Sequence, residues 1–481
     1  MTAQLPELAQ WTIDSLFIDG QWRPSSAGER TAVYDCATED QVGSVVAASA
    51  ADIEAAVAAA RRALPSWSAL RPSERAQFLR SWSDELAKRR EELTGIISSE
   101  VGTAVRLCSP VQVESALTEL QAVISVLSEM AFETQVGHST VLHEAVGVVG
   151  AVTPWNFPLF QATGKIGAAL AAGCTVVHKP SSLAPLSLVI LAQAAERAGL
   201  PPGVYNMITG PGRGIDEALA EHPGIAMISF TGSTMAGKRV YELGAPTLKR
   251  VTLELGGKSG SVLLEDAPLE QAVKMSVNRA FLNSGQTCDA WTRLIVPRSS
   301  LDQVLDVAAG SADRLVVGDP FDERTRIGPV ISAEQQARVR DYINGAVSDG
   351  ARIVTGGAEQ PSGLTRGHYV LPTVLRDVTR DMRAAREEIF GPVLVVLSYD
   401  TEDEAAELAD ATDYGLSSAV WSEDRDRAIT FARRLHSGQV VVNGAGFDAF
   451  APFGGVKMSG LGRELGVVGI QEFLEPKALV L

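Results

Sequence analysis

The spacing of apolar residues changes along the chain and divides it into a helical beginning and an alternating remainder. After a short start at LFIDGQW, helical spacing dominates to about Met130. The segment PSERAQFLRSWSDELAKRREELTGI opens with proline and serine, a helix start signal, and places Leu79, Trp82 and Leu86 on one face. The first part of the chain is therefore expected to be mainly helical.

From Val146 the pattern predicts strands that alternate with helices. VGVVGAVT, CTVVHK, VYNMIT and IAMISF are typical of buried strands, and helical segments such as GKIGAALAAG and PLSLVILAQAAERAG separate them. Such alternation makes right-handed crossovers and a parallel sheet. RVTLELGGKSGSVLL ends this series, and a second alternating region with TRLIVP, ARIVTGG and VLVVLSY continues to about Val442. The predicted fold class is α/β, with tightly joined domains and a cleft between them.

Composition and charge narrow the classes of function. The 481 residues are 46% hydrophobic and 21% charged, which fits two or three compact globular domains. A formal net charge of −16 argues against binding to nucleic acid or to an anionic membrane surface. The start MTAQLPELAQWTIDS lacks the pattern of a secretory signal, and no apolar run reaches the length of a membrane span. A cytoplasmic protein without nucleic-acid or membrane partners is expected.

The cysteines draw attention to one turn. They are widely scattered, form no C-x-x-C pair and predict neither a disulfide framework nor a zinc site: Cys36, Cys108, Cys174 and Cys288. No H-E-x-x-H pair occurs among the six histidines, so no metal site is expected. Three of the cysteines fit an apolar core, whereas Cys288 lies in the polar turn NSGQTCDAWTRL. This turn could present a sulfur at a cleft.

Two further polar residues stand in unusual positions. Glu254 lies in the apolar strand VTLELGGKSG, where a carboxylate is costly to bury unless it is neutral, paired or used as an acid or base. The structural alternative is an ion pair with Lys258. Asn156, in VTPWNFPLF, could cap the next helix or donate a hydrogen bond to a developing oxyanion.

Two strand ends are candidates for ligand binding. Lys179 ends the strand in TVVHKPSS, and open α/β sheets bind ligands at such ends, although a solvated loop lysine is the simpler interpretation. In SFTGSTMAGK a strand runs into Gly232 and Ser233 before a helix begins, and helix N-termini attract phosphate. The GPGRG fragment at Gly210 is a weaker glycine signal of the same kind.

Together, these motifs closely resemble the aldehyde dehydrogenase superfamily. TPWNFP, KPS, FTGS, LELGGKS, GQTC, EEIFGPV and PFGGVKMSGLGRELG occur in the family's order and approximate spacing, and the likeness covers nearly the whole chain from FIDGQW to the tail. The resemblance implies an NAD(P)-dependent enzyme that oxidises an aldehyde to a carboxylic acid through a cysteine thiohemiacetal and thioester.

The resemblance also implies a division into domains. A Rossmann-variant dinucleotide-binding domain without the G-x-G-x-x-G fingerprint takes residues 1–124 and 146–253, and an α/β catalytic domain takes residues 254–443. A small β oligomerisation element takes 125–145 and 465–481, and 444–464 form a connecting active-site segment. Because the apolar tail GIQEFLEPKALVL needs a strand partner, either packing within the monomer or a homodimer or homotetramer is expected.

Roles follow from the resemblance. Cys288 is expected to be the nucleophile, Asn156 the oxyanion donor and Glu254 the general base. The cofactor is expected to contact Thr153, Trp155, Lys179, Ser182, Gly210, Gly232, Ser233, Leu255, Glu388 and Phe390. Structural alternatives are a surface carboxylate for Glu388 and a core aromatic for Phe390.

Cofactor choice is expected to depend on the residue three positions after the lysine of KP. Many relatives carry a glutamate there, which bonds the 2′-hydroxyl of NAD and repels the 2′-phosphate of NADP. This chain has Ser182 instead, with Lys179 as a nearby cation, so NADP is expected to be accepted alongside NAD or in preference to it. The alternative is that Ser182 only caps the following helix and that NAD is preferred.

The resemblance also places a substrate tunnel. Its expected residues are Phe157, Gln161, Gly164, Thr287, Asp289 and Phe453. Because many relatives carry a bulky aromatic residue in place of Gly164, a roomy entrance for a bulky or aromatic aldehyde is expected. Asp289 would disfavour an anionic group nearby.

Three other functions are compatible with parts of the pattern. A CoA-acylating relative typically lacks the glutamate at the position of Glu254, so its presence favours hydrolysis. A catalytically silent binding or structural protein on this fold would be indicated by loss of Cys288 or Glu254, and both are present. A thiol hydrolase would need no nucleotide.

Overall fold

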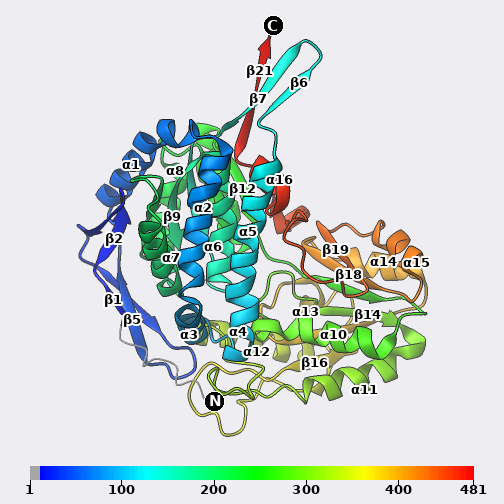
Figure 1. The fold of residues 1–481 in the computed structure, drawn as a ribbon. Coiled ribbons are helices and arrows are strands. Elements are labelled where there is room, and N and C mark those ends of the chain that lie inside the picture. Colours follow the sequence, from blue (N-terminus) through cyan, green and yellow to red (C-terminus); the bar gives the residue numbers. More distant parts are fainter. Residues whose placement is uncertain (1–10) are drawn as a thin grey trace.

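A computed structural model describes residues 11–481, and the first ten residues of the predicted segment 1–124 lie outside the described residues. The chain forms two lobes, each built on a sheet with helices on both faces, and a slender β arm that projects from the first lobe (Figure 1). This arrangement agrees with the α/β class expected from the sequence.

The first lobe contains an eight-stranded sheet in the order β20-β12-β11-β8-β9-β10-β2-β3. Its parallel strands are β8 (Val148–Thr153), β9 (Thr175–Pro180), β10 (Tyr205–Met207), β11 (Met227–Thr231) and β12 (Arg250–Glu254). The antiparallel strands are β2 (Ser15–Ile18), β3 (Gln21–Pro24) and β20 (Gly460–Leu461).

The order of the parallel strands creates a switch point. From β8 the chain moves through β9 to β10 on one side, and then returns to the other side of β8 for β11 and β12. In doubly wound sheets, ligands bind outside the carboxyl ends of the strands where the winding reverses. The fold therefore directs attention to the ends of β8 and β11.

Helices pack on both faces of this sheet. One face is covered by α2 (Pro72–Ala87), α3 (Arg90–Val101), α5 (Glu114–Glu129), α6 (Pro158–Ala172) and α7 (Leu186–Arg197), and the other by α1 (Ala50–Ser68), α8 (Gly212–Glu221) and α9 (Thr234–Gly244). Short elements complete the lobe: β1 (Trp11–Ile13), β4 (Arg30–Tyr34), β5 (Gln41–Val46) and α4 (Val105–Cys108).

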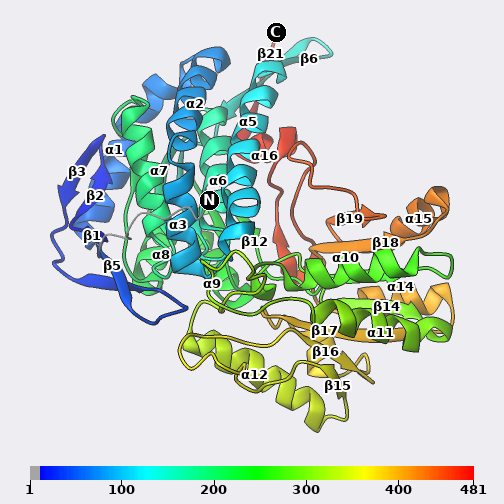
Figure 2. The ribbon, with the colours of Figure 1, turned by 60° about the horizontal axis from the view of Figure 1, so that its bottom comes forward.

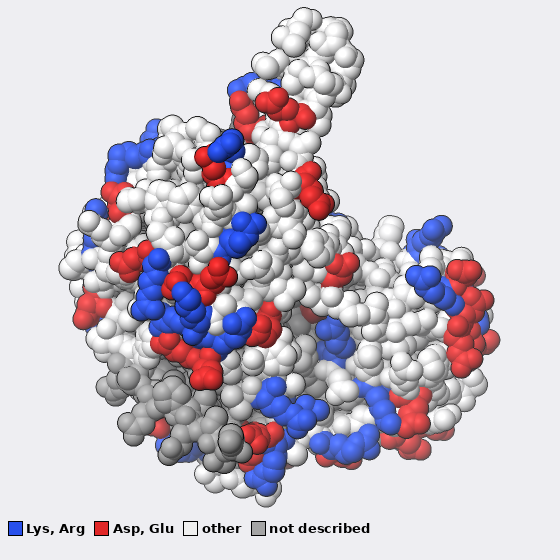
Figure 3. All heavy atoms as spheres, viewed as in Figure 1, with Lys and Arg blue, Asp and Glu red and all other residues white. Residues whose placement is uncertain are grey.

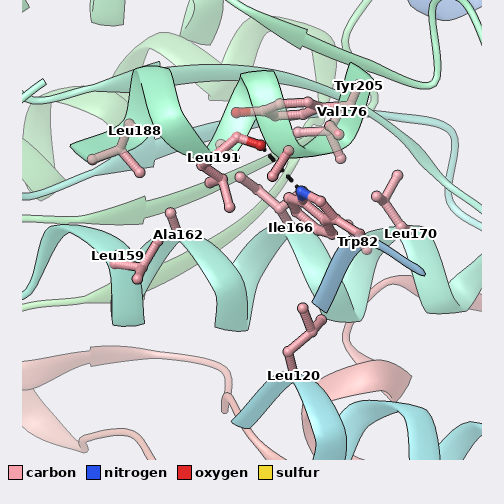
Figure 4. Packing of buried hydrophobic residues seen from close by; sticks show 14 of the residues in the cluster. Trp82, Leu120, Leu159, Ala162, Ile166, Leu170, Val176, Leu188, Leu191 and Tyr205 are labelled. Atoms are coloured by element: carbon pink, nitrogen blue, oxygen red, sulfur yellow. Dashed lines mark hydrogen bonds between the residues drawn. The ribbon is translucent and has the colours of Figure 1, made fainter. Parts of the chain in front are cut away.

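The core of the first lobe surrounds Trp82 of α2. This side chain is fully buried among residues of α5, α6 and α7, and its Nε1 donates a hydrogen bond to the carbonyl oxygen of Leu191 at 3.1 Å (Figure 4). A buried indole thus keeps its one polar atom satisfied. Helix α6, which begins just after Asn156, is buried along almost its entire length and is rich in alanine and glycine. Its close packing fixes the position of the residues at its start.

The second lobe contains a seven-stranded sheet in the order β15-β16-β17-β14-β13-β18-β19, in which only β15 is antiparallel. The strands are β13 (Gly260–Leu263), β14 (Arg293–Pro297), β15 (Arg352–Thr355), β16 (Thr373–Arg376), β17 (Val393–Tyr399), β18 (Ser417–Trp421) and β19 (Gln439–Val442). The helices are α10 (Leu269–Phe281), α11 (Leu301–Ala312), α12 (Ala333–Ser348), α13 (Arg383–Arg386), α14 (Glu402–Asp410) and α15 (Arg425–Ala432). Figure 2 labels all of them except α13, which is labelled in Figure 1. Residues 255–259 connect β12 to β13, so the two sheets meet directly after Glu254.

The arm is a three-stranded sheet in the order β21-β7-β6, formed by β6 (Glu133–Val136), β7 (Ser139–Ala145) and β21 (Leu474–Val480). The tail strand therefore pairs within its own chain, along seven residues of β7. The segment bounds differ from the expected 125–145 and 465–481, because α5 continues to Glu129 and α16 (Gly466–Gln471) packs on the helices of the first lobe. Within residues 11–481, every helix is too short or too polar to cross a membrane.

Candidate active site

A cleft of about 390 Å³ lies at the carboxyl ends of the first sheet, facing the second lobe. It is lined by Pro154, Trp155, Asn156, Gln161, Thr231, Gly232, Ser233, Glu254, Leu255, Gly256, Cys288, Glu334, Gln335, Arg338, Glu388 and Phe390. The segments that follow β8 and β11 both contribute, so the cleft occupies the switch point of the sheet. The three residues expected to be catalytic share this cleft.

The turn that carries Cys288 has an unusual backbone. Asn283, Ser284 and Gly285 have φ angles of 52°, 58° and 73°, and two of these three left-handed residues are not glycine. Left-handed non-glycine residues are strained and persist where surrounding contacts hold them. Here Thr103 Oγ1 donates to Asn283 Oδ1 at 2.7 Å, and Gln286 Oε1 accepts the N–H of Ile331 at 2.8 Å. Buried hydrogen bonds from two separate segments therefore hold the turn.

Asn156 is anchored to the same turn. Its Nδ2 donates to the carbonyl oxygen of Gln286 at 3.0 Å, and its own carbonyl oxygen accepts from the side chains of Gln112 at 2.8 Å and Asn283 at 3.0 Å. The side chain does not cap α6, whose N-cap residue is Phe157. An amide nitrogen has two hydrogens, and one of them holds this bond, which leaves the other for a ligand in the cleft.

Glu254 ends β12 with a buried carboxyl group. Neither oxygen has a hydrogen-bond partner among the described residues, and the expected alternative of an ion pair with Lys258 is not formed. Burial raises the pKa of Glu254 far above its usual range, and nearby Glu464 raises it further, while Lys165 and Arg463 lower it. A Cβ at Gly454, whose φ is +144°, would lie only 2.5 Å from Oε1, so bare backbone covers this carboxyl group.

A buried ion pair beside Glu254 was not anticipated from the sequence. Lys165 of α6 contacts Glu464, and the lysine side chain is fully buried. These residues lie 299 positions apart in the sequence, so no local pattern could pair them. Their effect on the pKa of Glu254 makes them part of the electrostatic environment of this carboxyl group.

The space beside Gly164 is filled, which corrects the expectation of a roomy entrance at this position. A Cβ on Gly164 would lie 2.4 Å from Oε1 of Glu119, a buried residue of α5. Thr163 Oγ1 donates to the other carboxyl oxygen at 3.0 Å. The small residue thus makes room for a buried acid from a neighbouring helix, and not for substrate.

Glu388 lies inside the cleft and is not a surface carboxylate. Its Oε1 accepts the N–H of Gly257 at 3.1 Å, and a Cβ on Gly256 would lie 2.3 Å from Oε2. Burial raises the pKa of Glu388 to about 7, and the hydrogen bond from Gly257 opposes this shift. Gly256 therefore leaves the space that the Glu388 carboxyl group occupies, and Gly257 holds this group by a hydrogen bond.

Phe390 packs edge-on against Trp155, with ring centroids 5.4 Å apart. Its φ is +61°, and Gln335 Nε2 donates to its carbonyl oxygen at 2.7 Å. Arg338 donates to the carbonyl oxygen of Glu388 at 2.7 Å. Sequence reasoning missed these contributions of α12, because the helix reaches the cleft only through the fold.

The end of β9 differs from the expectation of a free lysine. Lys179 Nζ lies 3.1 Å from Asp216 Oδ1 of α8, so the cation is already paired. Ser182 is half-buried after the strand. Helix α7 begins later at Leu186, with Pro185 as its N-cap and no side-chain cap, so Ser182 does not cap this helix. Gly210 has a φ of +134°, and a Cβ there would lie 2.6 Å from Ile215, which indicates a structural turn.

The other expected site residues lie around the cleft. Thr153 is buried, and its Oγ1 is 2.9 Å from His178 Nε2. Gln161 lines the cleft, and Thr287 Oγ1 donates to the carbonyl oxygen of Leu282 at 3.1 Å. Three remaining tunnel candidates do not line the cleft: Phe157, Asp289 and Phe453.

A second, larger cleft of about 1140 Å³ opens beside the turn that carries Cys288. Leu282 at the start of that turn lines it, together with Val111, Met275 and Phe447. Phe447 packs edge-on against Phe160 with ring centroids 5.7 Å apart, and half of its surface is exposed. This arrangement provides an apolar opening close to Leu282.

The first cleft suits a dinucleotide. Ser233 is the N-cap of α9, so the unpaired N–H groups of this helix begin at the cleft, where anions are favoured. Glu388 presents a carboxyl group for a sugar hydroxyl, and Trp155 and Phe390 offer apolar surface. No group of three or more potential metal ligands occurs within residues 11–481.

The environment of Cys288 favours the thiol over the thiolate. Burial raises the pKa of its thiol well above the usual range, and the charges of Asp289, Glu254 and Glu388 raise it further. A thiolate is the reactive form, so its formation requires either a higher pH or a change in the surrounding charge.

The comparisons with known proteins agree with this geometry. The family model for the aldehyde dehydrogenase family matches residues 22–479. Among curated relatives, 3-succinoylsemialdehyde-pyridine dehydrogenase of Pseudomonas sp is 44% identical over 466 residues, with 96% of this chain and 98% of that protein covered. Geranial dehydrogenase of Castellaniella defragrans is 42% identical over 479 residues, with 98% and 99% covered.

Solved structures give the same result. Aldehyde dehydrogenase C of Pseudomonas syringae, a cysteine-to-alanine mutant complexed with NAD+ and octanal, has a TM-score of 0.96 at 45% identity, with 99% of this chain and 97% of that chain covered. An aldehyde dehydrogenase of Mycobacterium tuberculosis complexed with NAD+ has a TM-score of 0.96 at 38% identity, with 98% and 99% covered. The chain therefore belongs to the aldehyde dehydrogenase family and oxidises aldehydes with a nicotinamide dinucleotide, which confirms the recognition and the fold class predicted from the sequence.

Replacement of Asp289 tests the electrostatic environment of Cys288. In Asp289→Asn, loss of the adjacent negative charge should lower the pKa of the thiol and shift the pH profile of iodoacetamide alkylation to lower pH, with faster labelling at pH 8. Mass spectrometry of the peptide that contains Cys288 gives the rate. The control is Asp302→Asn, which removes an exposed charge elsewhere and should leave the profile unchanged. An unchanged profile in Asp289→Asn would exclude this charge as a cause.

Proposed function

We propose that this enzyme oxidises a bulky or long apolar aldehyde to its carboxylic acid by covalent catalysis at Cys288, followed by hydrolysis. The observation that carries the proposal is the convergence of Cys288, Asn156 and Glu254 on one cleft at the switch point of the first sheet. Such a set combines a nucleophile, an oxyanion donor and a base around one reacting carbon.

In the first half of the reaction, the Cys288 thiol loses its proton to water, and the resulting thiolate adds to the aldehyde carbon. The resulting oxyanion accepts hydrogen bonds from the Asn156 amide and the backbone N–H of Cys288. The negative oxygen then expels hydride, for which the oxidised nicotinamide supplies the acceptor when it is bound. The product is a thioester on Cys288.

In the second half, Glu254 accepts a proton from the water that attacks the thioester, and the carbon–sulfur bond breaks to release the carboxylic acid and the Cys288 thiolate. A general base works best with a pKa near the operating pH, and burial moves the pKa of Glu254 upward from the range of an ordinary carboxylate. The Lys165–Glu464 pair and Arg463 lie close enough to influence this carboxyl group. Acidic and basic neighbours therefore act on the pKa of Glu254 in opposite directions.

The cofactor is proposed to lie along the carboxyl ends of the first sheet. Its nicotinamide end would contact Glu388, Phe390 and Leu255, and its pyrophosphate would lie at Gly232 and Ser233. This placement is supported by the shared cleft and by the helix terminus at Ser233. Acceptance of NADP, expected from Ser182, stays a prediction.

The alternative function of a thiol hydrolase would need no nucleotide. A fluorescence titration with NAD+ distinguishes this hydrolase from a dehydrogenase.

The apolar opening at Leu282 and Phe447 supports an apolar substrate. The relatives named above include a geranial dehydrogenase and a complex with octanal, both of which involve apolar aldehydes. A panel of octanal, geranial, benzaldehyde and ω-carboxy aldehydes, followed by absorbance of the reduced nicotinamide, tests this. A higher kcat/KM for the ω-carboxy aldehydes would overturn the assignment of substrate class.

Hydrolysis is favoured over transfer to CoA because Glu254 lines the cleft. A silent binding protein is disfavoured because the nucleophile, the oxyanion donor and the base lie together. We place the enzyme in the cytoplasm, since all four cysteines are unpaired and three of them are buried, which suits a reducing compartment.

We propose that the protein forms a homodimer or homotetramer, because the arm and α9 expose apolar surface. Both outer strands of the arm are edges, and its exposed apolar residues include Val136, Val480 and Leu481. Figure 3 shows the far end of the arm as an almost uncharged surface, with charged side chains gathered near its base. Exposed strand edges with apolar side chains are typical of interaction surfaces. Met235 of α9 and Leu248 just beyond it add further exposed apolar surface.

Replacement of the nucleophile should separate binding from chemistry. Cys288→Ala should abolish aldehyde oxidation and leave dinucleotide affinity nearly unchanged, because only the sulfur forms the covalent bond. Turnover and quenching of tryptophan fluorescence by NAD+ measure the two properties. Wild-type turnover in this variant would end the assignment of Cys288.

Replacement of the base should slow only the second half of the reaction. Glu254→Gln should reduce steady turnover by roughly 10²–10⁴-fold, the usual contribution of a positioned general base, while a burst of about one reduced cofactor per active site survives. Stopped-flow absorbance measures both phases. Glu265→Gln, which removes an exposed charge outside the cleft, should show wild-type turnover. Unchanged burst and steady phases in Glu254→Gln would make Glu254 structural.

Removal of residues from Pro476 onward should weaken assembly. The truncation deletes most of β21 and leaves one edge of β7 without its partner strand. Sedimentation velocity across a range of protein concentrations measures the oligomer. An oligomer of unchanged size and stability would exclude the tail strand from the assembly.

A further inference from the structure

The end of β9 lacks the acidic residue that this position usually provides in doubly wound sheets. Where the first strand and the switch point bind a dinucleotide, an aspartate or glutamate after the second strand accepts a hydrogen bond from the adenosine 2′-hydroxyl. In the first lobe β8 is the first strand and β9 the second. The residues at and after the end of β9 are Lys179, Pro180, Ser181 and Ser182, with no carboxylate among them.

A carboxylate reaches this place from another element. Asp216, in the second turn of α8, lies with Oδ1 3.1 Å from Lys179 Nζ. The lysine side chain is 2% exposed and that of Asp216 is 21% exposed, so the carboxylate is the more accessible member of the pair. A ligand that approaches the end of β9 therefore meets an anion before it meets the buried cation.

Gly212 leaves room over this pair. A Cβ at that position would lie 3.0 Å from Asp216 Oδ2 and 3.5 Å from Lys179 Nζ. The missing side chain therefore keeps a path to Oδ2, the carboxyl oxygen not placed against the lysine. This oxygen can accept a hydrogen bond from a hydroxyl group of a bound sugar.

We propose that Asp216 reads the 2′-hydroxyl of the adenosine ribose and makes the enzyme prefer NAD over NADP. The inference rests on the proposed position of the dinucleotide at the switch point. The 2′-phosphate of NADP would bring a second anion next to a carboxylate whose neighbouring cation is already paired. Asp216, which belongs to α8, thereby performs the role that an acidic residue after the second strand usually has. Ser182 is not required for discrimination between NAD and NADP.

Asp216→Asn tests this directly. The amide keeps the size of the side chain and removes the charge, so Lys179 becomes available to a 2′-phosphate. Wild-type enzyme should bind NAD+ at least about tenfold more tightly than NADP+, and the variant should reduce this ratio by at least about tenfold, as expected for one close charge pair near a surface. Quenching of tryptophan fluorescence gives both dissociation constants without an aldehyde, and the ratio of kcat/KM values should change in parallel.

The adjacent residue offers a matched control. Glu217→Gln makes the same change of charge one position along α8, in a residue that pairs with Arg239 on the surface. Its ratio of NAD+ to NADP+ affinity should equal that of the wild type. Asp216→Glu, which retains the charge, should also continue to favour NAD+.

Salt dependence distinguishes repulsion from a loss of structure. Because salt screens charges, the wild-type preference for NAD+ should decrease as ionic strength rises, whereas that of Asp216→Asn should change less. If the ion pair is only structural, Asp216→Asn lowers the thermal midpoint and weakens both cofactors equally, which overturns the proposal. A wild-type preference for NADP+, or a large change of ratio in Ser182→Glu with none in Asp216→Asn, also overturns it.

The failure of the broader function would look different. If neither dinucleotide quenches the fluorescence, the cofactor site itself is misplaced. If both bind and aldehyde oxidation is absent, the catalytic assignment fails while the discrimination by Asp216 is still measured by the two dissociation constants.

Discussion

The junction between the two sheets depends on the absence of side chains at two successive residues after Glu254, Gly256 and Gly257. A Cβ on Gly256 would lie 2.3 Å from a carboxyl oxygen of Glu388, and a Cβ on Gly257 would lie 2.4 Å from the carbonyl oxygen of Cys288. These glycines join the two sheets, so the same short segment receives the nucleophile's backbone from one side and a cleft carboxylate from another. Any side chain here would force two elements of the second lobe away from the first.

Around this junction the protein buries acidic side chains whose carboxyl groups it does not fully satisfy with partners. Glu254 has no hydrogen-bond partner among the described residues, and Glu119 is buried nearby in α5 with a raised pKa caused mainly by burial. Lys165 supplies the cation, paired with Glu464. Leaving a carboxyl group without partners destabilises a fold, so such groups are concentrated where proton transfer requires them. The strained turn before Cys288 is likewise unfavourable by itself, and buried hydrogen bonds from other segments maintain it.

The sequence was sufficient for features that depend on local pattern. Strand-like runs such as VGVVGAVT and IAMISF form β8 and β11, and Cys288 and Glu254 stand out because their residue types conflict with their surroundings. It was insufficient where two distant residues share one space. Gly164 suggested an empty entrance until Glu119 was seen to fill it, and Lys179 suggested a free cation until Asp216 was found beside it. A missing volume or an unpaired charge can be judged only when its neighbours are known.

The pairing of β21 with β7 has a consequence for folding during synthesis. Strand β7 can gain its neighbour β21 only after the whole second lobe has been synthesised, and Lys165 likewise waits for Glu464. Since domains fold from the N-terminus as the ribosome releases them, the first lobe folds with one arm edge open and one buried lysine unpaired. Residues 464–480 therefore complete both the arm and the set of charges around Glu254, so a nascent chain cannot acquire its finished catalytic environment before this segment has been synthesised.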